Sequence, residues 1–327
     1  MMAACICENL QWDAVNVMFG LISCHIPLQL KAELCLTLAA LGGYAATAPR
    51  VAAALDAAQL VSSDSRGRGL AADLAEVECR IEEYPLSRAF LTLLISLSKN
   101  SPMALAGAAL EPCTRHALEL ALRHQHRSYA KPVEKTQILS LCLELLVLWL
   151  SSYTPSSADL TGRAPPPLHV ALRLHSGDEL LRMILTTLRE AVDELPNRGP
   201  QQPYIEKCAI HCMQLLERGL AMERALAQAA GAAGRALVVV GLSKLLLDPL
   251  PQLLAQAAGA AGRALVVVGL SKLLLGVPKE ECPLLAACRA LSTPAVRVWA
   301  PAVALLTRCC SPAAAARLLP HADTYTR

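Results

Sequence analysis

The feature that most constrains the fold of this chain is a helical period in its apolar residues, with almost no alternation of the kind that strands show. Between residues 85 and 98 an apolar residue recurs on every helical turn: Leu86, Phe90, Leu93 and Leu97. Pro85 suits the first position of this helix, and Tyr84, which precedes a proline, is pushed out of the helical region. The pattern predicts a helix that begins at Pro85 and a tight elbow that joins it to a separate helix over residues 74–83.

The composition agrees with a core made of stacked helices. Apolar residues make up 54% of the 327 residues but aromatic residues only 3%, so Leu, Ala and Val must supply most of the interior. Strands favour β-branched and aromatic side chains, whereas Leu and Ala are strong helix formers. The sequence therefore predicts an all-α fold with no sheet. We expect an α-solenoid of stacked antiparallel helix pairs, of the kind built by HEAT and armadillo repeats.

The breaks between the expected helices are mostly short. Three longer ones, rich in Ser, Gly and Pro, are expected to be surface loops near residues 62–69, 153–167 and 196–203. The sequence keeps the same character on either side of these loops, so we expect residues 1–327 to form one continuous α-solenoid segment. One helix start is legible within it, because Ser176 and Glu179 have the spacing of a capping box.

One stretch of sequence occurs twice without a change. Residues 226–247, LAQAAGAAGRALVVVGLSKLLL, recur as residues 254–275 with an offset of 28. Solenoid repeats normally diverge and keep only a pattern. Full identity at one place therefore indicates a recent duplication or a gene-model error, and it says little about architecture. Gly231 and Gly234 weaken the first helix of the repeat, so we expect this region to be the least well packed.

Charge and hydropathy argue against several classes of protein. Lys and Arg total 30 and Asp and Glu total 27, and a net charge of +3 is too small to predict nucleic-acid binding. No uninterrupted apolar run reaches the roughly 18 residues of a transmembrane segment, and the first residues lack the basic start of a secretory signal. The thirteen cysteines are an odd number and are scattered along the chain. This usage indicates a reducing compartment, the cytosol or the nucleus.

No pattern in the sequence predicts catalytic, cofactor-binding or metal-ligating residues. Nucleophile elbows, phosphate loops, dinucleotide-binding glycine patterns and His-Glu-X-X-His helices do not occur. Cys208, His211 and Cys212 share one helix face, but a structural zinc site needs a fourth ligand, and no Cys-X-X-Cys supplies it at ordinary spacing. We expect a buried thiol face with a satisfied histidine, and neither a cofactor, a small-molecule substrate nor enzyme activity. The alternative is a metal protein or enzyme that uses this face.

Four dipeptides have the minimal pattern of a proline-directed phosphorylation site, with the hydroxyl on Ser101, Thr154, Thr293 and Ser311. For three of the four, a hydroxyl that caps a helix before a proline is the simpler explanation. The sequence therefore favours helix caps over phosphorylation as the explanation of these dipeptides.

The segment 76–91, EVECRIEEYPLSRAFL, resembles a known family. It is similar to the region of the largest inner-ring scaffold nucleoporins of the nuclear pore complex, the two-hundred-and-five-kilodalton family, that carries a Glu-Glu-Tyr-Pro-Leu-Ser/Thr-Arg-Ala-Phe signature. In this chain the signature consists of Glu82, Glu83, Tyr84, Pro85, Leu86, Ser87, Arg88, Ala89 and Phe90. A similar segment precedes the signature at residues 19–42, and others follow it in the family's order within residues 127–146, 165–190, 204–220, 265–276 and 309–310. Thr136, which stands where the family usually has a tryptophan, and the duplication depart from the family pattern.

The resemblance implies a structural role. The family's members are long α-helical solenoids of the inner ring, several times longer than this chain, and they are bound by helical or linear segments of linker nucleoporins. We therefore expect a scaffold segment of the nuclear pore complex in the nuclear envelope, with other nucleoporins as partners. We also expect the chain to be an internal piece of a longer protein or a truncated gene model.

The resemblance assigns no binding residue. The signature is expected to form a structural elbow between two helices, with Arg88 and Glu82 as neighbours at that corner. The alternative function is that of a cytosolic helical-repeat adaptor that binds amphipathic helices of partner proteins, because such an adaptor would show the same periodicities.

Overall fold

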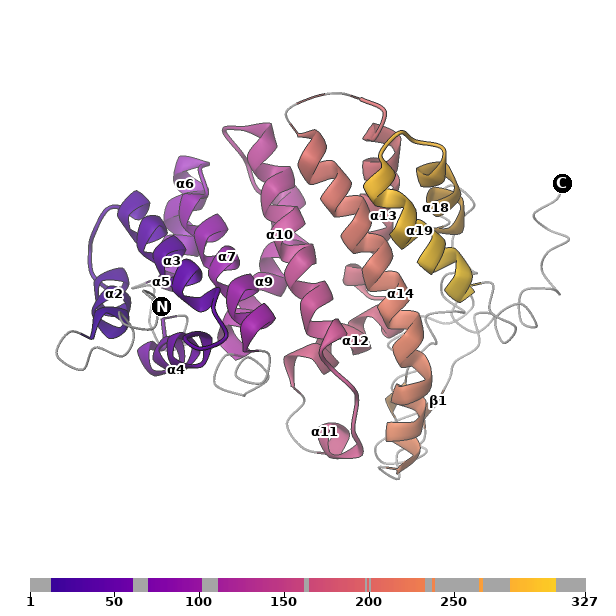
Figure 1. The fold of residues 1–327 in the computed structure, drawn as a ribbon, viewed down its shortest axis with the longest axis horizontal. Helices are drawn as coiled ribbons and strands as arrows, with labels where there is room; N and C mark the ends of the chain where they lie inside the picture. The colour runs from indigo at the N-terminus through magenta and orange to yellow at the C-terminus, as the bar shows by residue number, and fades with distance from the viewer. Residues whose placement is uncertain are drawn as a thin grey trace, which may run out of the picture. The chain divides into compact units, whose positions relative to one another are not determined.

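The computed structural model describes residues 13–60, 70–101, 111–161, 165–197, 199, 201–232, 237–238, 265–266 and 283–309. Within these residues the chain is helical almost throughout (Figure 1), which confirms the all-α prediction. The loop expected at 62–69, most of the duplicated stretch and Ser311 lie outside the described residues.

The chain divides into two compact units, Met1–Ser152 and Tyr153–Arg327. Their boundary falls at the start of the loop expected at 153–167. Each unit buries its own set of apolar side chains, so each is described by itself. The continuous solenoid over residues 1–327 stays a prediction.

The first unit is built around one central helix. Its elements are α2 (Ala14–Ser23), α3 (Leu28–Gly42), α4 (Ala48–Ala58), α5 (Leu70–Ala72), the π-helical turn η1 (Asp73–Val77), α6 (Glu78–Ile81), α7 (Pro85–Asn100), α9 (Glu111–Arg123), the 3-10 turn η3 (His124–His126) and α10 (Pro132–Ser151). Helix α7 begins at Pro85, as the sequence predicts. It packs against α3, α4 and α10, and its apolar side chains are buried on more than the one face that the period indicates.

The contact between α3 and α7 is close because the end of α3 lacks a side chain. A Cβ atom at Gly42 would lie 2.9 Å from Cδ2 of Leu97, closer than two such atoms normally approach. Two polar side chains of α7 also reach across: Ser96 Oγ donates to the carbonyl oxygen of Ala39 at 2.7 Å, and Asn100 Nδ2 donates to that of Gly42 at 3.1 Å. These bonds satisfy carbonyl groups at the C-terminus of α3 that its own helix leaves unpaired.

The second unit packs along one long helix. Its helices are α11 (Ser157–Thr161), α12 (Pro166–Ser176), α13 (Glu179–Glu194), α14 (Gln202–Ala232), α18 (Pro283–Leu291) and α19 (Val296–Cys309). Helix α14 contacts α11, α12, α13 and α19, and α18 packs against both α13 and α19. Figure 1 shows α13, α14, α18 and α19 side by side. The short connections between α12 and α13 and between α18 and α19 are typical of antiparallel helix pairs.

Two of the expected loops are shorter than the sequence indicates. Helix α11 lies inside the stretch 153–167, and α14 starts at Gln202, inside the stretch 196–203. In the first case Ser156 Oγ accepts from the Asp159 N–H at 3.3 Å, and Asp159 Oδ2 accepts from the Ser156 N–H at 3.1 Å. This reciprocal capping stabilises a single turn of helix in sequence that composition alone describes as a loop.

The helix start expected at Ser176 is wrong by two residues. Ser176 ends α12, and its hydroxyl donates to the carbonyl oxygen of Arg173 at 3.0 Å. Gly177 follows in the left-handed region with φ of 70°, which ends that helix. Asp178 then caps α13, accepting from the Glu179 N–H at 2.8 Å.

The one pair of strands among the described residues lies in the duplicated stretch. Strands β1 (Leu237–Val238) and β2 (Leu265–Val266) pair in parallel, with Leu237 opposite Leu265 and Val238 opposite Val266. Each residue therefore pairs with its own copy, 28 positions later. This two-residue pairing is the only exception to the expected absence of a sheet within the described residues.

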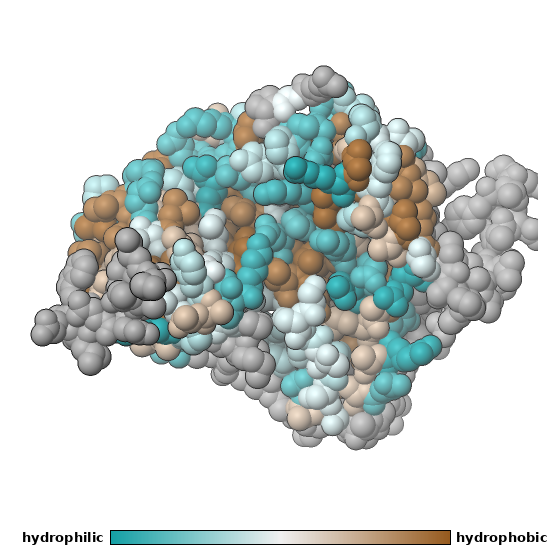
Figure 2. All heavy atoms as spheres, in the orientation of Figure 1, coloured by the Kyte–Doolittle hydropathy of each residue, from teal (hydrophilic) through white to brown (hydrophobic). Residues whose placement is uncertain are grey.

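Some large apolar side chains remain exposed. On α19, Val296, Trp299 and Val303 lie at i, i+3 and i+7 and are 64%, 40% and 50% exposed, on a different face from its buried residues Val298, Ala302 and Leu305. Figure 2 shows hydrophobic surface over α18 and α19. Helix α2 likewise exposes Val17 and Leu21. Of the helices in the described residues, none combines the length and the apolar character needed to cross a bilayer.

Candidate functional site

The signature residues surround the start of α7, which has no cap of its own. Residues Glu82–Tyr84 separate α6 from α7, and Glu82 adopts a left-handed conformation with φ of 58°. Tyr84 occupies the capping position, but its side chain makes no bond to the first turn. The first free N–H groups of α7 therefore need another acceptor. We call the segment from Ile81 to Pro85 the elbow.

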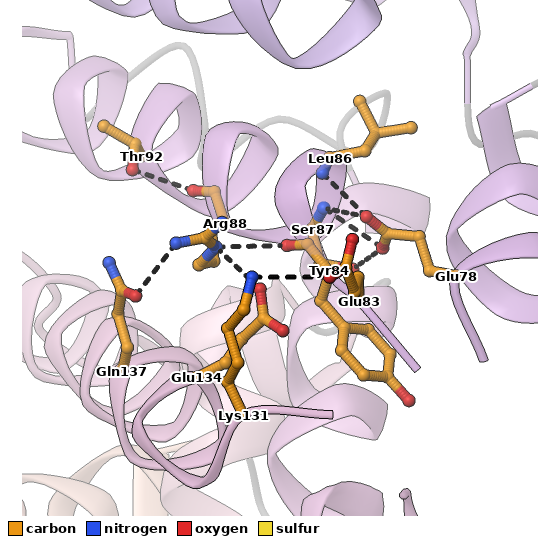
Figure 3. Close-up of polar contacts among 10 residues, drawn as sticks. All are labelled: Glu78, Glu83, Tyr84, Leu86, Ser87, Arg88, Thr92, Lys131, Glu134 and Gln137. Atoms are coloured by element: carbon orange, nitrogen blue, oxygen red, sulfur yellow. Dashed lines mark hydrogen bonds and ion pairs between the residues drawn. The ribbon is translucent and has the colours of Figure 1, made fainter. Parts of the chain in front are cut away.

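Glu78, in the preceding helix, supplies that acceptor (Figure 3). Its Oε1 accepts from the Leu86 N–H at 2.7 Å and from the Ser87 N–H at 3.1 Å, and its Oε2 accepts from the Ser87 hydroxyl. The Glu78 side chain of α6 thus caps α7 across the elbow, and its hydrogen bonds to Leu86 and Ser87 join the two helices. Ser87 serves both as a helix residue and as a donor to the cap.

Burial sets the charge state of this cap. Glu78 is fully buried. Desolvation raises the pKa of its carboxyl group to about 7, although the hydrogen bonds from Ser87 and Leu86 and the charge of Arg127 act in the other direction. A pKa near 7 means that the Glu78 carboxyl group changes between its neutral and charged forms near neutral pH.

Tyr84 fixes the elbow to the segment that follows η3. Its hydroxyl donates to the carbonyl oxygen of Ser128 at 2.9 Å, and its ring centroid lies 4.8 Å from that of Tyr129. The guanidinium carbon of Arg127 lies 5.6 Å from the Tyr84 ring centroid, within the range of a cation–π contact. The Ala130 N–H donates to the carbonyl oxygen of Glu82 at 2.9 Å. Residues 127–130 thus clamp the elbow from outside.

Arg88 connects the same elbow to α10. Its Nε lies 3.4 Å from the carbonyl oxygen of Tyr84 and 3.1 Å from Oε1 of Glu134, and its Nη1 donates to Oε1 of Gln137 at 3.1 Å. The expectation that Arg88 and Glu82 are simple neighbours misses this pairing, because the partner of Arg88 comes from α10. An outer pair, Lys131 Nζ with Glu83 Oε1 at 3.3 Å, is exposed.

The structure brings together most of the signature. Tyr84, Leu86, Ser87, Ala89 and Phe90 are buried, Pro85 and Arg88 are half-buried, and Glu82 and Glu83 are exposed. Glu78, Glu134 and Gln137 are the contributors that the sequence argument missed. A helix that begins with proline and has no Ser, Thr, Asn or Asp before it could have prompted a search for a distant carboxylate, but nothing in the local sequence singles out Glu78.

The Cys208 face has the properties of packed core side chains. Cys208 and Cys212 are buried, and desolvation raises the pKa of the Cys208 thiol to about 12 and that of Cys212 well above its ordinary value. His211 Nδ1 lies 3.1 Å from Oε1 of Gln214. Protonated thiols are poor metal ligands, and within the described residues no group of three or more His, Cys, Asp or Glu side chains could hold a metal ion.

Comparison with known proteins identifies the family. The model of the family described as the nuclear pore complex scaffold, nucleoporins 186/192/205, matches residues 2–230. The chain belongs to this family. The signature and the elbow lie inside the matched residues, so the resemblance seen in the sequence is confirmed.

Two relatives show the extent of the similarity. The chain is 31% identical over 264 residues to nuclear pore complex protein Nup205 of Drosophila melanogaster and 30% identical over 266 residues to that of Homo sapiens. These alignments cover 76% and 74% of this chain but only 13% of either relative. The chain thus spans about an eighth of the length of the relatives it matches.

Proposed function

We propose that this chain is a structural segment of the nuclear pore complex scaffold, located at the nuclear envelope. The observation that carries the proposal is the family match over residues 2–230, which includes the elbow. Both relatives are named as nuclear pore complex proteins. An elbow fixed by Glu78, Tyr84 and Arg88 suits a scaffold, because it holds three helices at set angles and uses its buried polar groups for internal bonds.

The finer proposal places the chain in the inner ring, where it binds helical or linear segments of linker nucleoporins. The support is an apolar surface that the chain's own described residues leave uncovered. Helix α19 is apolar on two faces, and only one of them packs against α14 and α18. A helix that is apolar on both faces is normally covered on both, and an amphipathic helix of a partner can provide such a cover. We propose no enzyme activity for this segment.

Localisation in cells tests the proposal that the chain is part of the nuclear pore scaffold. A fluorescent tag is fused to the endogenous protein that carries this chain, and the cells are imaged together with a known pore component. We expect a punctate nuclear rim that coincides with the pores. A diffuse cytosolic signal would contradict the proposal and favour the cytosolic adaptor.

Peptide binding tests the proposal that the chain binds segments of linker nucleoporins. The purified full chain is titrated with synthetic linker-nucleoporin segments, and binding is followed by fluorescence anisotropy. We expect Val303→Asp to weaken binding by about tenfold or more, because a charge would be buried against the peptide. The matched control is Ala304→Asp, an exposed position on α19 that lies about 100° around the helix from Val303. Equal binding by both variants would remove α19 as the docking face.

A further inference from the structure

The structure separates the Ser-Pro and Thr-Pro dipeptides into two kinds. Ser101 ends α7, and its N–H is bonded to the carbonyl oxygen of Leu97 at 2.7 Å. Thr293 is 8% exposed, and its hydroxyl donates to the carbonyl oxygen of Ala290 at 2.8 Å. Both hydroxyl residues therefore take part in the ends of helices, and their place before a proline has a structural explanation.

Thr154 has no such explanation. It is exposed and lies in the non-helical stretch between α10 and α11, followed by Pro155. Neither its hydroxyl nor its N–H has a hydrogen-bond partner among the residues that the structure describes. The cap of α11 is Ser156, which exchanges hydrogen bonds with Asp159. The hydroxyl of Thr154 is thus free of any capping role.

We propose that Thr154 is a phosphorylation site for a proline-directed Ser/Thr protein kinase. The Thr154 Oγ1 attacks the γ-phosphorus of ATP, and the bond between that phosphorus and the bridging oxygen of ADP breaks. The catalytic base of the kinase takes the hydroxyl proton. Protein kinases bind their substrates as extended chains, and the residue before a proline is held in the extended region. Residues 153–156 lie outside both neighbouring helices and Thr154 is exposed, so the kinase can reach Thr154 without unfolding α10.

The phosphate acts on α11. It adds a charge of about −1.5 to −2 near Asp159, whose Oδ2 holds the loop together by accepting from the Tyr153 hydroxyl at 2.8 Å and from the Ser156 N–H. Repulsion between the phosphate and the Asp159 carboxylate weakens these two hydrogen bonds, which we call the Asp159 clasp. The Ser156 and Asp159 N–H groups are already bonded to Asp159 Oδ2 and Ser156 Oγ, so neither is free to bind the phosphate and offset the repulsion. Helix α11, which packs against α14, therefore loosens.

Kinase labelling tests the site. The full chain carrying Ser311→Ala is incubated with a proline-directed kinase and Mg-ATP, and phosphate is located by peptide mass spectrometry. Rates at Thr154 and Thr293 are each divided by the rate on a free peptide of the same local sequence. We expect the normalised rate at Thr154 to exceed that at Thr293 by more than about tenfold, because Thr293 must first be exposed by local unfolding.

Matched variants complete this test. Thr154→Ala should abolish the Thr154 signal, Thr154→Ser should keep it, and Thr293→Ala should leave it unchanged. Absence of phosphate on Thr154, or equal normalised rates at the two threonines, would overturn the proposal.

Hydrogen exchange tests the consequence. Amides of residues 157–161 should exchange several-fold faster in the phosphorylated chain than in the unmodified chain. Those of α13 should not change. Equal or slower exchange in α11 would show that the phosphate does not loosen the clasp.

Discussion

At the scale of single residues, the hydrogen bonds by which Glu78 caps α7 contribute measurably to the free energy of unfolding. Glu78→Ala removes the acceptor for two buried N–H groups and for the Ser87 hydroxyl. We expect the free energy of unfolding to fall by about 2–3 kcal/mol, the cost of leaving buried donors unpaired. The measurement is urea unfolding followed by circular dichroism.

The matched control for this variant is Glu83→Ala. Glu83 is exposed and pairs only with the exposed Lys131, so its removal should change the free energy of unfolding by less than about 0.5 kcal/mol. If the two variants were equally stable, Glu78 would not cap α7 in solution.

The same carboxyl group makes stability depend on pH. Its pKa is near 7 in the folded chain and near its ordinary value of 4.5 in the unfolded chain. Between these values the folded chain holds the extra proton, so this contribution to the free energy of unfolding is lost as pH rises from about 4.5 to about 7. Burial lowers the pKa of His116, His124 and His175, and these groups have the opposite effect.

The difference between wild type and Glu78→Gln isolates the carboxyl group from these histidines. We expect the wild type to lose stability relative to the variant as pH rises through this range, with no further change above about pH 8. Urea unfolding at several pH values measures the difference. A difference that is constant with pH would contradict the raised pKa.

At the scale of elements, two ion pairs join the same two helices in different surroundings. Arg88 and Glu134 link α7 to α10 with Glu134 buried, whereas Lys99 and Glu144 link them with Lys99 half exposed. Double-mutant cycles should give a coupling energy above about 1 kcal/mol for the first pair and below it for the second. The variants are Arg88→Met with Glu134→Gln and Lys99→Met with Glu144→Gln. Equal couplings would contradict the part assigned to Arg88.

Local sequence predicts those helix ends that depend on one or two neighbouring residues. Pro85 and Tyr84 mark the start of α7 because the proline ring restricts both residues. The cap of α13 was misplaced because Gly177, in a left-handed conformation, assigns Ser176 to the previous helix. Glu78 could not be predicted as the cap of α7, because its position depends on how α6 packs against α7 after the elbow.

The ion-pair partner of Arg88 was missed for a related reason. Glu134 lies 46 positions further along the chain and reaches Arg88 only because α10 packs against α7. Helical periodicity identifies which face of α7 is apolar, but it does not identify the helix that covers that face. The family resemblance locates the elbow correctly and leaves its bonding partners to the structure.

At the scale of the whole molecule, the exposed apolar residues predict self-association. We expect the purified chain to form concentration-dependent oligomers in sedimentation velocity, because Val296, Trp299 and Val303 form an uncovered apolar face. Val303→Glu should reduce association by about tenfold or more, whereas Ala304→Glu, at an exposed position outside this face, should not. A wild-type chain that stays monomeric at all accessible concentrations would contradict this expectation and weaken the case for a docking face on α19.

The capping of α7 from the preceding helix also determines where this protein can be divided. An expression boundary placed at Pro85, the most obvious start of a helix, would remove Glu78 and leave the Leu86 and Ser87 N–H groups of α7 without their acceptor. A boundary before Leu70 keeps the donor and the acceptor in one fragment. For truncation experiments, a fragment that contains α7 should therefore also contain α6, so that Glu78 can cap the first turn of α7.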